Sequence, residues 1–284
     1  MKSLRRLHPQ VWVAEKVMRY VPGASLRTRM TVLSLSSPEA AEPELAVISP
    51  IELTPGLRED LEELGGKKAV KHVISPNKAH HLFAAGFQEA FPEAKFYAPA
   101  GLREKKDKER LAHYHHLIYF EGPPEEHAAF ASLHFGTSAA PLARPRLQFI
   151  PIQGMPMLDE LLFFHPASGT MVLTDLAFNI PRGEPLAEDG VSFAESPLAY
   201  LYVWAMGVGR GHTCEHRLVP SKVIASRLVV KRPKEMVGSL ERARQEWGNL
   251  QRVIMAHGQV IEGEAEANRA RDEMIAAYKS RLRA

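Results

Sequence analysis

Residues of types that bind metal ions follow three apolar segments of the sequence, each at a point where a strand is expected to end. His80 and His81 follow the first segment, Asp175 follows the second and His257 follows the third. Strands of one sheet commonly end along a shared edge, so these side chains can meet there. Each residue alone has an ordinary explanation in turn formation, capping or packing. Their joint placement favours a site for Zn²⁺, Fe²⁺ or Mn²⁺, which histidine and carboxylate ligands suit.

The segment before Asp175 has the pattern of a β-hairpin. Two apolar runs, 161–165 and 172–174, flank the turn signal Ser168-Gly169, and such a pair predicts two antiparallel strands. Asp175 is therefore expected where the chain leaves a buried strand. Further strands are predicted at 31–35, 45–50, 69–76, 95–99, 117–120, 147–152 and 252–256, and helices at 57–64, 82–91, 234–252 and 264–284.

The order of these elements is typical of an α/β (α+β) protein. The N-terminal part reads as a β-meander, and helix and strand then alternate from residue 57 to residue 99. The helix at 82–91 is expected to place Leu82, Phe83, Phe87 and Phe91 on one side. Residues 101–110 form a charge run typical of a solvated surface, and 122–146 predicts a loop with a short helix.

Composition narrows the functional classes. A net charge of +3 over 284 residues gives no indication of nucleic-acid binding. The single cysteine, Cys214, excludes an internal disulfide and a metal site built from several cysteines. No apolar run reaches the ~20 residues of a membrane span, so a soluble, cytoplasmic protein is expected. Without a repeat or a linker, residues 1–284 are expected to form a single domain, and the sequence leaves the oligomeric state open.

The ordered series of motifs resembles the metallo-β-lactamase superfamily. That family's Thr-His-x-His-x-Asp-His motif falls on residues 75–81, which read Ser-Pro-Asn-Lys-Ala-His-His. Its later Gly-His-Thr falls on 154–156, which read Gly-Met-Pro. Its bridging aspartate falls on Asp175 and its last histidine on His257. The resemblance covers most of the chain and points to a divergent branch of the superfamily in which the motif is degenerate. It implies a four-layer αββα sandwich with a metal centre at one edge.

The resemblance also implies that one of the family's two metal sites is lost. The three histidines of the first site are replaced by Pro76, Lys78 and Met155, none of which is a usual zinc ligand. The positions of the second site all carry residues that can bind metal. One divalent ion, zinc or iron or manganese, is therefore expected on His80, His81, Asp175 and His257.

Such a site suits a mononuclear metal-dependent hydrolase that acts on a small ester-like or lactone-like substrate. Two alternatives remain open: a non-catalytic or sensor-like member that keeps the fold, and an iron-dependent redox enzyme. The candidate catalytic residues are Lys78, Asn77 and Asn179, with His165 as a further polar neighbour. For both asparagines, turn formation is the ordinary explanation.

Other segments carry residues with competing interpretations. His212 and His216 flank Cys214 at a spacing that fits one helix face, although Gly209 and Gly211 favour a loop. His113, His115 and His116 form a further histidine group, and the aromatic segment 198–208 reads either as a buried helix or as a pocket wall.

Overall fold

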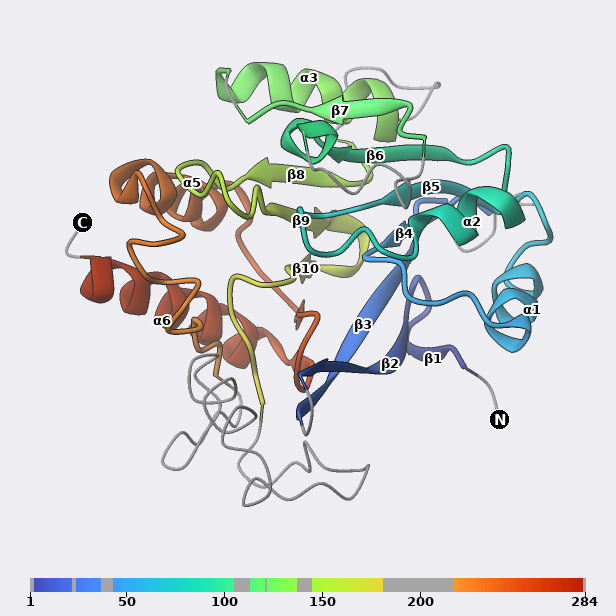
Figure 1. The fold of residues 1–284 in the computed structure, drawn as a ribbon, viewed down its shortest axis with the longest axis horizontal. Coiled ribbons are helices and arrows are strands. Elements are labelled where there is room, and N and C mark those ends of the chain that lie inside the picture. The colour runs from blue at the N-terminus through green and yellow to red at the C-terminus, as the bar shows by residue number, and fades with distance from the viewer. Residues whose placement is uncertain are drawn as a thin grey trace.

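The computed structural model describes residues 3–21, 24–36, 43–104, 113–120, 122–136, 145–180 and 217–282. Within these ranges the chain forms two β-sheets packed face to face, with helices on their outer faces (Figure 1). The predicted αββα sandwich is confirmed. The aromatic segment 198–208 and the group His212, Cys214 and His216 lie outside the described residues, as does most of the charge run.

The first sheet contains the N-terminal strands in sequence order. They are β1 (Arg5–His8), β2 (Val11–Val21), β3 (Ala24–Ser34), β4 (Leu45–Ile48), β5 (Val70–Ile74), β6 (Lys95–Pro99) and β7 (His116–Ile118). The pairs from β1 to β4 are antiparallel, and those from β4 to β7 are parallel. Parallel pairing follows from the crossover connections, two of which contain α1 (Pro55–Glu63) and α2 (Ala84–Ala90).

The second sheet is built from the C-terminal half in the order β12-β11-β10-β9-β8. Its strands are β8 (Gln148–Pro151), β9 (Leu161–His165), β10 (Thr170–Val172), β11 (Arg252–Ile254) and β12 (Ile261–Glu262). The strands β9 and β10 pair antiparallel as the predicted hairpin, and β10 pairs parallel with β11. Since β10 and β11 run in the same direction, the residues that follow them leave the sheet at one edge.

In the part of the chain that the structure describes, three groups of buried apolar side chains hold the layers together. Leu57 and Phe87 pack with the outer face of the first sheet, whereas Leu240 of α5 (Pro233–Glu246) and Tyr278 of α6 (Glu264–Leu282) pack on the second. Between the sheets lies a third group from both inner faces, together with Phe135 of α3 (Pro124–Phe135). Because strand side chains alternate between faces, each sheet contributes to two of these layers.

The helices expected at 234–252 and 82–91 are both shorter in the structure. The helix expected at 234–252 ends at Glu246, because Trp247 turns inward and stacks on Phe164 with ring centroids 5.5 Å apart. The helix expected from residue 82 begins only at Ala84. The expectation that Leu82 shares one side of this helix with Phe87 is therefore wrong: Leu82 lies outside the helix and is 44% exposed, whereas Phe87 is buried. Among the helices of the described residues, none has the length and apolar character required to cross a membrane.

Gly169 fixes the turn between β9 and β10. Its backbone is left-handed, with φ 59° and ψ 29°, and a Cβ there would lie 2.7 Å from Cγ of Gln251. We expect Gly169→Ala to lower the free energy of unfolding by about 1 kcal/mol, the usual penalty of this conformation for a residue with a side chain. Urea denaturation measures the change.

Gly238 of α5 supplies the matched control. It lies exposed inside the helix, and apart from its chain neighbours and the backbone of its own helix, no atom lies within 4 Å of the position of a Cβ there. Gly238→Ala should raise the free energy of unfolding by roughly 0.5–1 kcal/mol, because alanine is the better helix former. Equal effects of the two substitutions would contradict the interpretation.

Candidate metal centre

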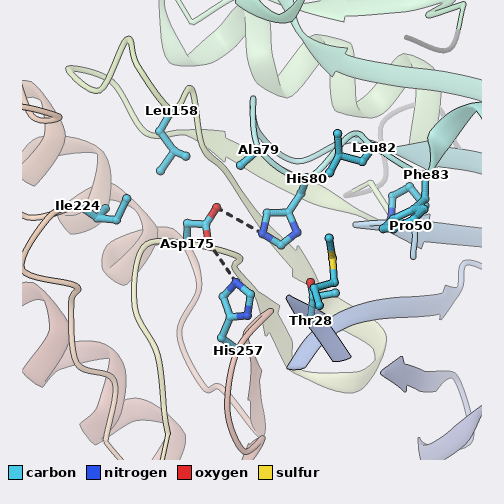
Figure 2. Close-up of a pocket in the computed structure, with 11 residues that line it drawn as sticks. Thr28, Pro50, Ala79, His80, Leu82, Phe83, Leu158, Asp175, Ile224 and His257 are labelled. Atoms are coloured by element: carbon cyan, nitrogen blue, oxygen red, sulfur yellow. Dashed lines mark ion pairs between the residues drawn. The ribbon is translucent and has the colours of Figure 1, made fainter. Parts of the chain in front are cut away.

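His80, Asp175 and His257 meet at one edge of the two sheets. His80 lies in the turn after β5 of the first sheet, and Asp175 and His257 follow β10 and β11 of the second. One potential ligand atom of each lies within 4.8 Å of the other two. His80 Nε2 is 3.3 Å from Asp175 Oδ2, and His257 Nε2 is 3.5 Å from Asp175 Oδ1, so both imidazoles face the carboxylate (Figure 2).

Each imidazole is held through its other ring nitrogen. His257 Nδ1 is 2.7 Å from the backbone oxygen of Arg27; a carbonyl only accepts, so Nδ1 carries the hydrogen and Nε2 of the neutral ring keeps a lone pair. His80 Nδ1 is 2.8 Å from Ser49 Oγ, and Ser49 has a left-handed φ of 57° at the end of β4. Such contacts orient histidine ligands in metal sites.

Asn77 orients the aspartate. Its Oδ1 accepts hydrogen bonds from the backbone amides of Ala79 and His80, at 2.7 and 2.8 Å. This assigns the Nδ2 group to the opposite side, where it donates to Asp175 Oδ2 at 2.8 Å. Asn77 is fully buried and thus connects the turn that carries His80 to Asp175.

The electrostatics follow from this arrangement. Burial opposes ionisation of Asp175, but the neighbouring His80 and His257 outweigh it and hold the pKa of the carboxyl well below its usual range. Burial likewise opposes protonation of His80, yet Asp175 raises its pKa. Burial and the charge of Asp175 raise the pKa of the adjacent Glu160 to about 7.

The three side chains fit a divalent metal ion. Ligand atoms about 2.0–2.1 Å from a tetrahedral zinc lie about 3.3 Å apart, close to the 3.3 and 3.5 Å between the imidazole nitrogens and the carboxylate. Two nitrogens and one oxygen suit zinc, iron or manganese. These three ligands from the described residues would leave one position of a four-coordinate zinc ion for water or another ligand.

His81 is not part of this group. Its side chain is buried, and Nδ1 lies 3.4 Å from the backbone oxygen of Ala79. The structure thus assembles three of the four residues expected from the sequence, and a ligand role for His81 stays a prediction.

The positions of the family's first metal site carry other contacts. Lys78 Nζ lies 2.6 Å from Asp159 Oδ2 and donates to the backbone oxygen of Pro156 at 2.7 Å. Met155 is buried in the apolar layer under α5 and α6, and the oxygen of Pro76 accepts a hydrogen bond from the amide of Leu161. These contacts tie Pro76 and Lys78 to the segment 156–161.

The remaining polar candidates have structural partners. Asn179 is buried and donates to the backbone oxygen of Gln259 at 2.9 Å. Gln259 follows His257 closely in sequence, but Asn179 is not one of the three residues His80, Asp175 and His257. His165 ends β9, which runs antiparallel to β10, so it lies at the opposite end of the hairpin from Asp175. Burial lowers the pKa of His165 to about 4.

In the histidine group at 113–116, His116 stacks on Tyr97 of β6, with ring centroids 4.9 Å apart.

A cavity of about 230 Å³ opens onto the three residues. Its other lining side chains are mostly apolar, and no lysine or arginine of the described residues lines it. Figure 2 shows Leu158 and Ile224 on the Asp175 side and Leu82, Phe83 and Pro50 on the His80 side. The full lining consists of Met18, Thr28, Pro50, Ala79, His80, Leu82, Phe83, Leu158, Asp175, Ile224 and His257.

Sequence reasoning missed several of these residues. Glu160, Ser49 and the Arg27 carbonyl support the site, and Met18 and Ile224 line its cavity. Only Glu160 had a local signal, an acidic residue directly before the apolar run of β9.

Comparison with known proteins places the fold. No family model matches the chain, and no curated protein matches it in sequence. Solved structures do match over nearly the whole chain. The metallo-β-lactamase DIM-1, exposed to ceftazidime, is 9% identical with a TM-score of 0.55, over 98% of this chain and 96% of that one. A metallo-β-lactamase from Pontibacter korlensis is 9% identical with a TM-score of 0.53, over 97% and 98% of the two chains.

A third match is the metallo-β-lactamase FIM-1 from Pseudomonas aeruginosa in its mono-zinc form. It is 12% identical with a TM-score of 0.53, over 98% of this chain and 94% of that one. The chain therefore has the metallo-β-lactamase fold, and the resemblance read from the sequence is confirmed at the level of the fold.

Proposed function

We propose that this protein is a mononuclear metal-dependent hydrolase of small, largely apolar ester-like or lactone-like substrates. The observation that carries the proposal is the group His80, Asp175 and His257 at the wall of an otherwise apolar cavity. The fold supports it, since its solved relatives are metallo-β-lactamases and one is described in a mono-zinc form.

The proposed chemistry divides between the metal and the protein. A divalent ion on these residues would polarise a carbonyl group and lower the pKa of a water molecule. The Arg27 carbonyl holds the proton of His257 on Nδ1, which keeps Nε2 directed at the site, and Asn77 fixes Asp175. The apolar walls bind the acyl part of the substrate and exclude bulk water.

The experiment begins with protein purified without added metal. Elemental analysis should find one equivalent of zinc, iron or manganese. Aryl esters, lactones and a chromogenic cephalosporin are then tested before and after chelation. Hydrolysis that disappears on chelation and returns with metal supports the proposal. A protein that binds no metal, or one whose metal-loaded form hydrolyses none of the substrates, contradicts it.

A non-catalytic member of the fold is the second candidate. Lys78 and Met155 stand at positions of the family's first metal site, where Lys78 forms an ion pair with Asp159 and Met155 packs in the core. In this candidate, the metal on the remaining residues has a structural or sensing role. This candidate predicts one bound metal without hydrolysis, and an oxygen-sensitive iron spectrum would instead favour redox chemistry.

Leu82 tests the cavity as the substrate site. It lines the cavity and is 44% exposed, so Leu82→Asp should fold normally while placing a charge beside the acyl group. For a neutral lactone we expect KM to rise about tenfold with a smaller change in kcat, because apolar contact is lost. Steady-state kinetics measure both constants.

Leu133→Asp is the matched control. Leu133 lies on α3, is 79% exposed and does not line the cavity. Its variant should leave KM unchanged, and equal KM values for both variants would place the substrate elsewhere.

A further inference from the structure

Glu160 is a carboxylate without solvent contact that is not one of the three metal-type residues. It directly precedes β9, and none of its surface is exposed. A buried carboxyl group is costly unless hydrogen bonds satisfy it, so its partners indicate what the position is for.

Within the described part of the chain, the hydrogen-bond partners of Glu160 are all donors. Oε1 accepts from the backbone amide of Thr174 at 2.7 Å, from its hydroxyl at 2.6 Å and from the amide of Asp175 at 3.1 Å. Oε2 accepts from Asn77 Nδ2 at 2.5 Å. Only a carboxylate offers acceptors to all four, because a glutamine side chain carries a donor in place of one oxygen.

These contacts join two of the three loops that carry the group, those of His80 and Asp175. Thr174 and Asp175 follow β10 of the second sheet, whereas Asn77 belongs to the turn after β5 of the first. The Nδ2 group of Asn77 lies between the carboxylates of Glu160 and Asp175, and its Oδ1 holds the amide of His80. The Glu160 side chain therefore fixes both the backbone of Asp175 and the side-chain amide of Asn77, which in turn orients Asp175 and His80.

We propose that Glu160 is a positioning residue of the metal centre: by holding Asn77, Thr174 and Asp175 together, it presets His80 and Asp175 for a divalent cation. The inference rests on the proposed metal site and extends it to a residue that touches neither metal nor substrate. Outer partners of this kind typically contribute about 10–100-fold to metal affinity.

The test is Glu160→Gln in the full chain, which keeps the shape but sets a donor against Asn77 Nδ2. Zinc affinity is measured by competition with a chromophoric chelator, and the absorption spectrum is recorded with saturating Co²⁺. We expect zinc to bind about 10–100-fold more weakly and the Co²⁺ bands to shift. A role confined to folding would lower the unfolding midpoint of the metal-free protein and change neither metal readout.

Asp159→Asn is the matched control. Asp159 is the adjacent carboxylate, pairs with Lys78 and has a left-handed φ of 51° that asparagine tolerates. Its variant should keep the wild-type zinc affinity. If wild-type protein and Asp159→Asn bind zinc and Glu160→Gln binds equally well, the inference on Glu160 is overturned while the proposed function stands. If the wild-type protein binds no divalent metal, both fall.

Thr174→Val decides the matter if Glu160→Gln does not fold. It removes the hydroxyl that donates to Glu160 at 2.6 Å and accepts from Asn77 Nδ2 at 3.0 Å, and it retains the shape of the side chain. Zinc binding weakened several-fold supports the inference, and unchanged binding overturns it.

Discussion

Replacing Asp175 with alanine is expected to weaken zinc binding more than about 100-fold, beyond the loss typical of an outer partner. Asp175 is the only carboxylate of the assembled group, and both imidazoles face it, at 3.3 and 3.5 Å. Without it, the two rings have no anionic ligand between them, and hydrolysis should fall to background. Calorimetric zinc titration and the ester assay measure the two effects.

Two histidine variants make this prediction specific. His257→Ala should reproduce the loss, because His257 Nε2 points at the same carboxylate. His81→Ala should keep zinc affinity within about tenfold, the lower end of an outer partner's effect, since His81 lies outside the group. A greater loss in His81→Ala than in His257→Ala would show that the fourth predicted ligand binds the metal after all.

The sequence could predict the three residues of the group because the signal at each is local. A polar residue directly after an apolar strand is visible without knowledge of the fold, and the parallel strands β10 and β11 bring two such residues together. The neighbours His80 and His81 show the limit of this reasoning. Both stand after the same strand, and only the turn set by Asn77, which accepts from two backbone amides, directs His80 into the group.

The supports of the site could not be predicted in the same way. The carbonyl that fixes His257 belongs to Arg27, 230 residues away in sequence, and any residue type offers a backbone oxygen. Ser49 reaches His80 from the end of β4, and Ile224 lines the cavity from the segment before α5. These contacts depend on how the two sheets pack, which hydrophobic periodicity leaves undetermined.

A second ion-paired group joins the two sheets away from the metal centre. Glu44, just before β4, accepts two hydrogen bonds from Arg146, just before β8, at 2.8 and 3.1 Å. His72 Nε2 of β5 lies 2.7 Å from the same carboxylate. Arg146 also donates to the backbone oxygens of Phe135 and Gly136, at the C-terminal end of α3. One carboxylate thus links β4, β5, α3 and β8.

The pH dependence of stability follows from Glu44. Burial opposes its ionisation, but hydrogen bonds from His72 and Arg146 outweigh burial and lower its pKa to about 2. A carboxyl whose pKa is lower in the folded state stabilises the protein above its unfolded pKa of about 4.3. That contribution is lost as the pH falls from about 4.3 towards 2. Because Glu44 is half-buried and solvent screens part of its interactions, the contribution of its carboxylate to the free energy of unfolding is about 2 kcal/mol at neutral pH.

Glu44→Gln should therefore lower the free energy of unfolding by about 2 kcal/mol at pH 7, and by less than half as much at pH 3. The difference in the free energy of unfolding shrinks because the Glu44 carboxyl of the unfolded wild-type chain is largely protonated at pH 3, whereas the glutamine of the variant does not titrate. Urea denaturation at both pH values measures it. Glu59→Gln, which alters an exposed carboxylate of α1, should stay within about 0.5 kcal/mol of the wild type. A Glu44→Gln deficit of equal size at pH 7 and pH 3 would show that shape, rather than the charge of Glu44, holds the sheets together there.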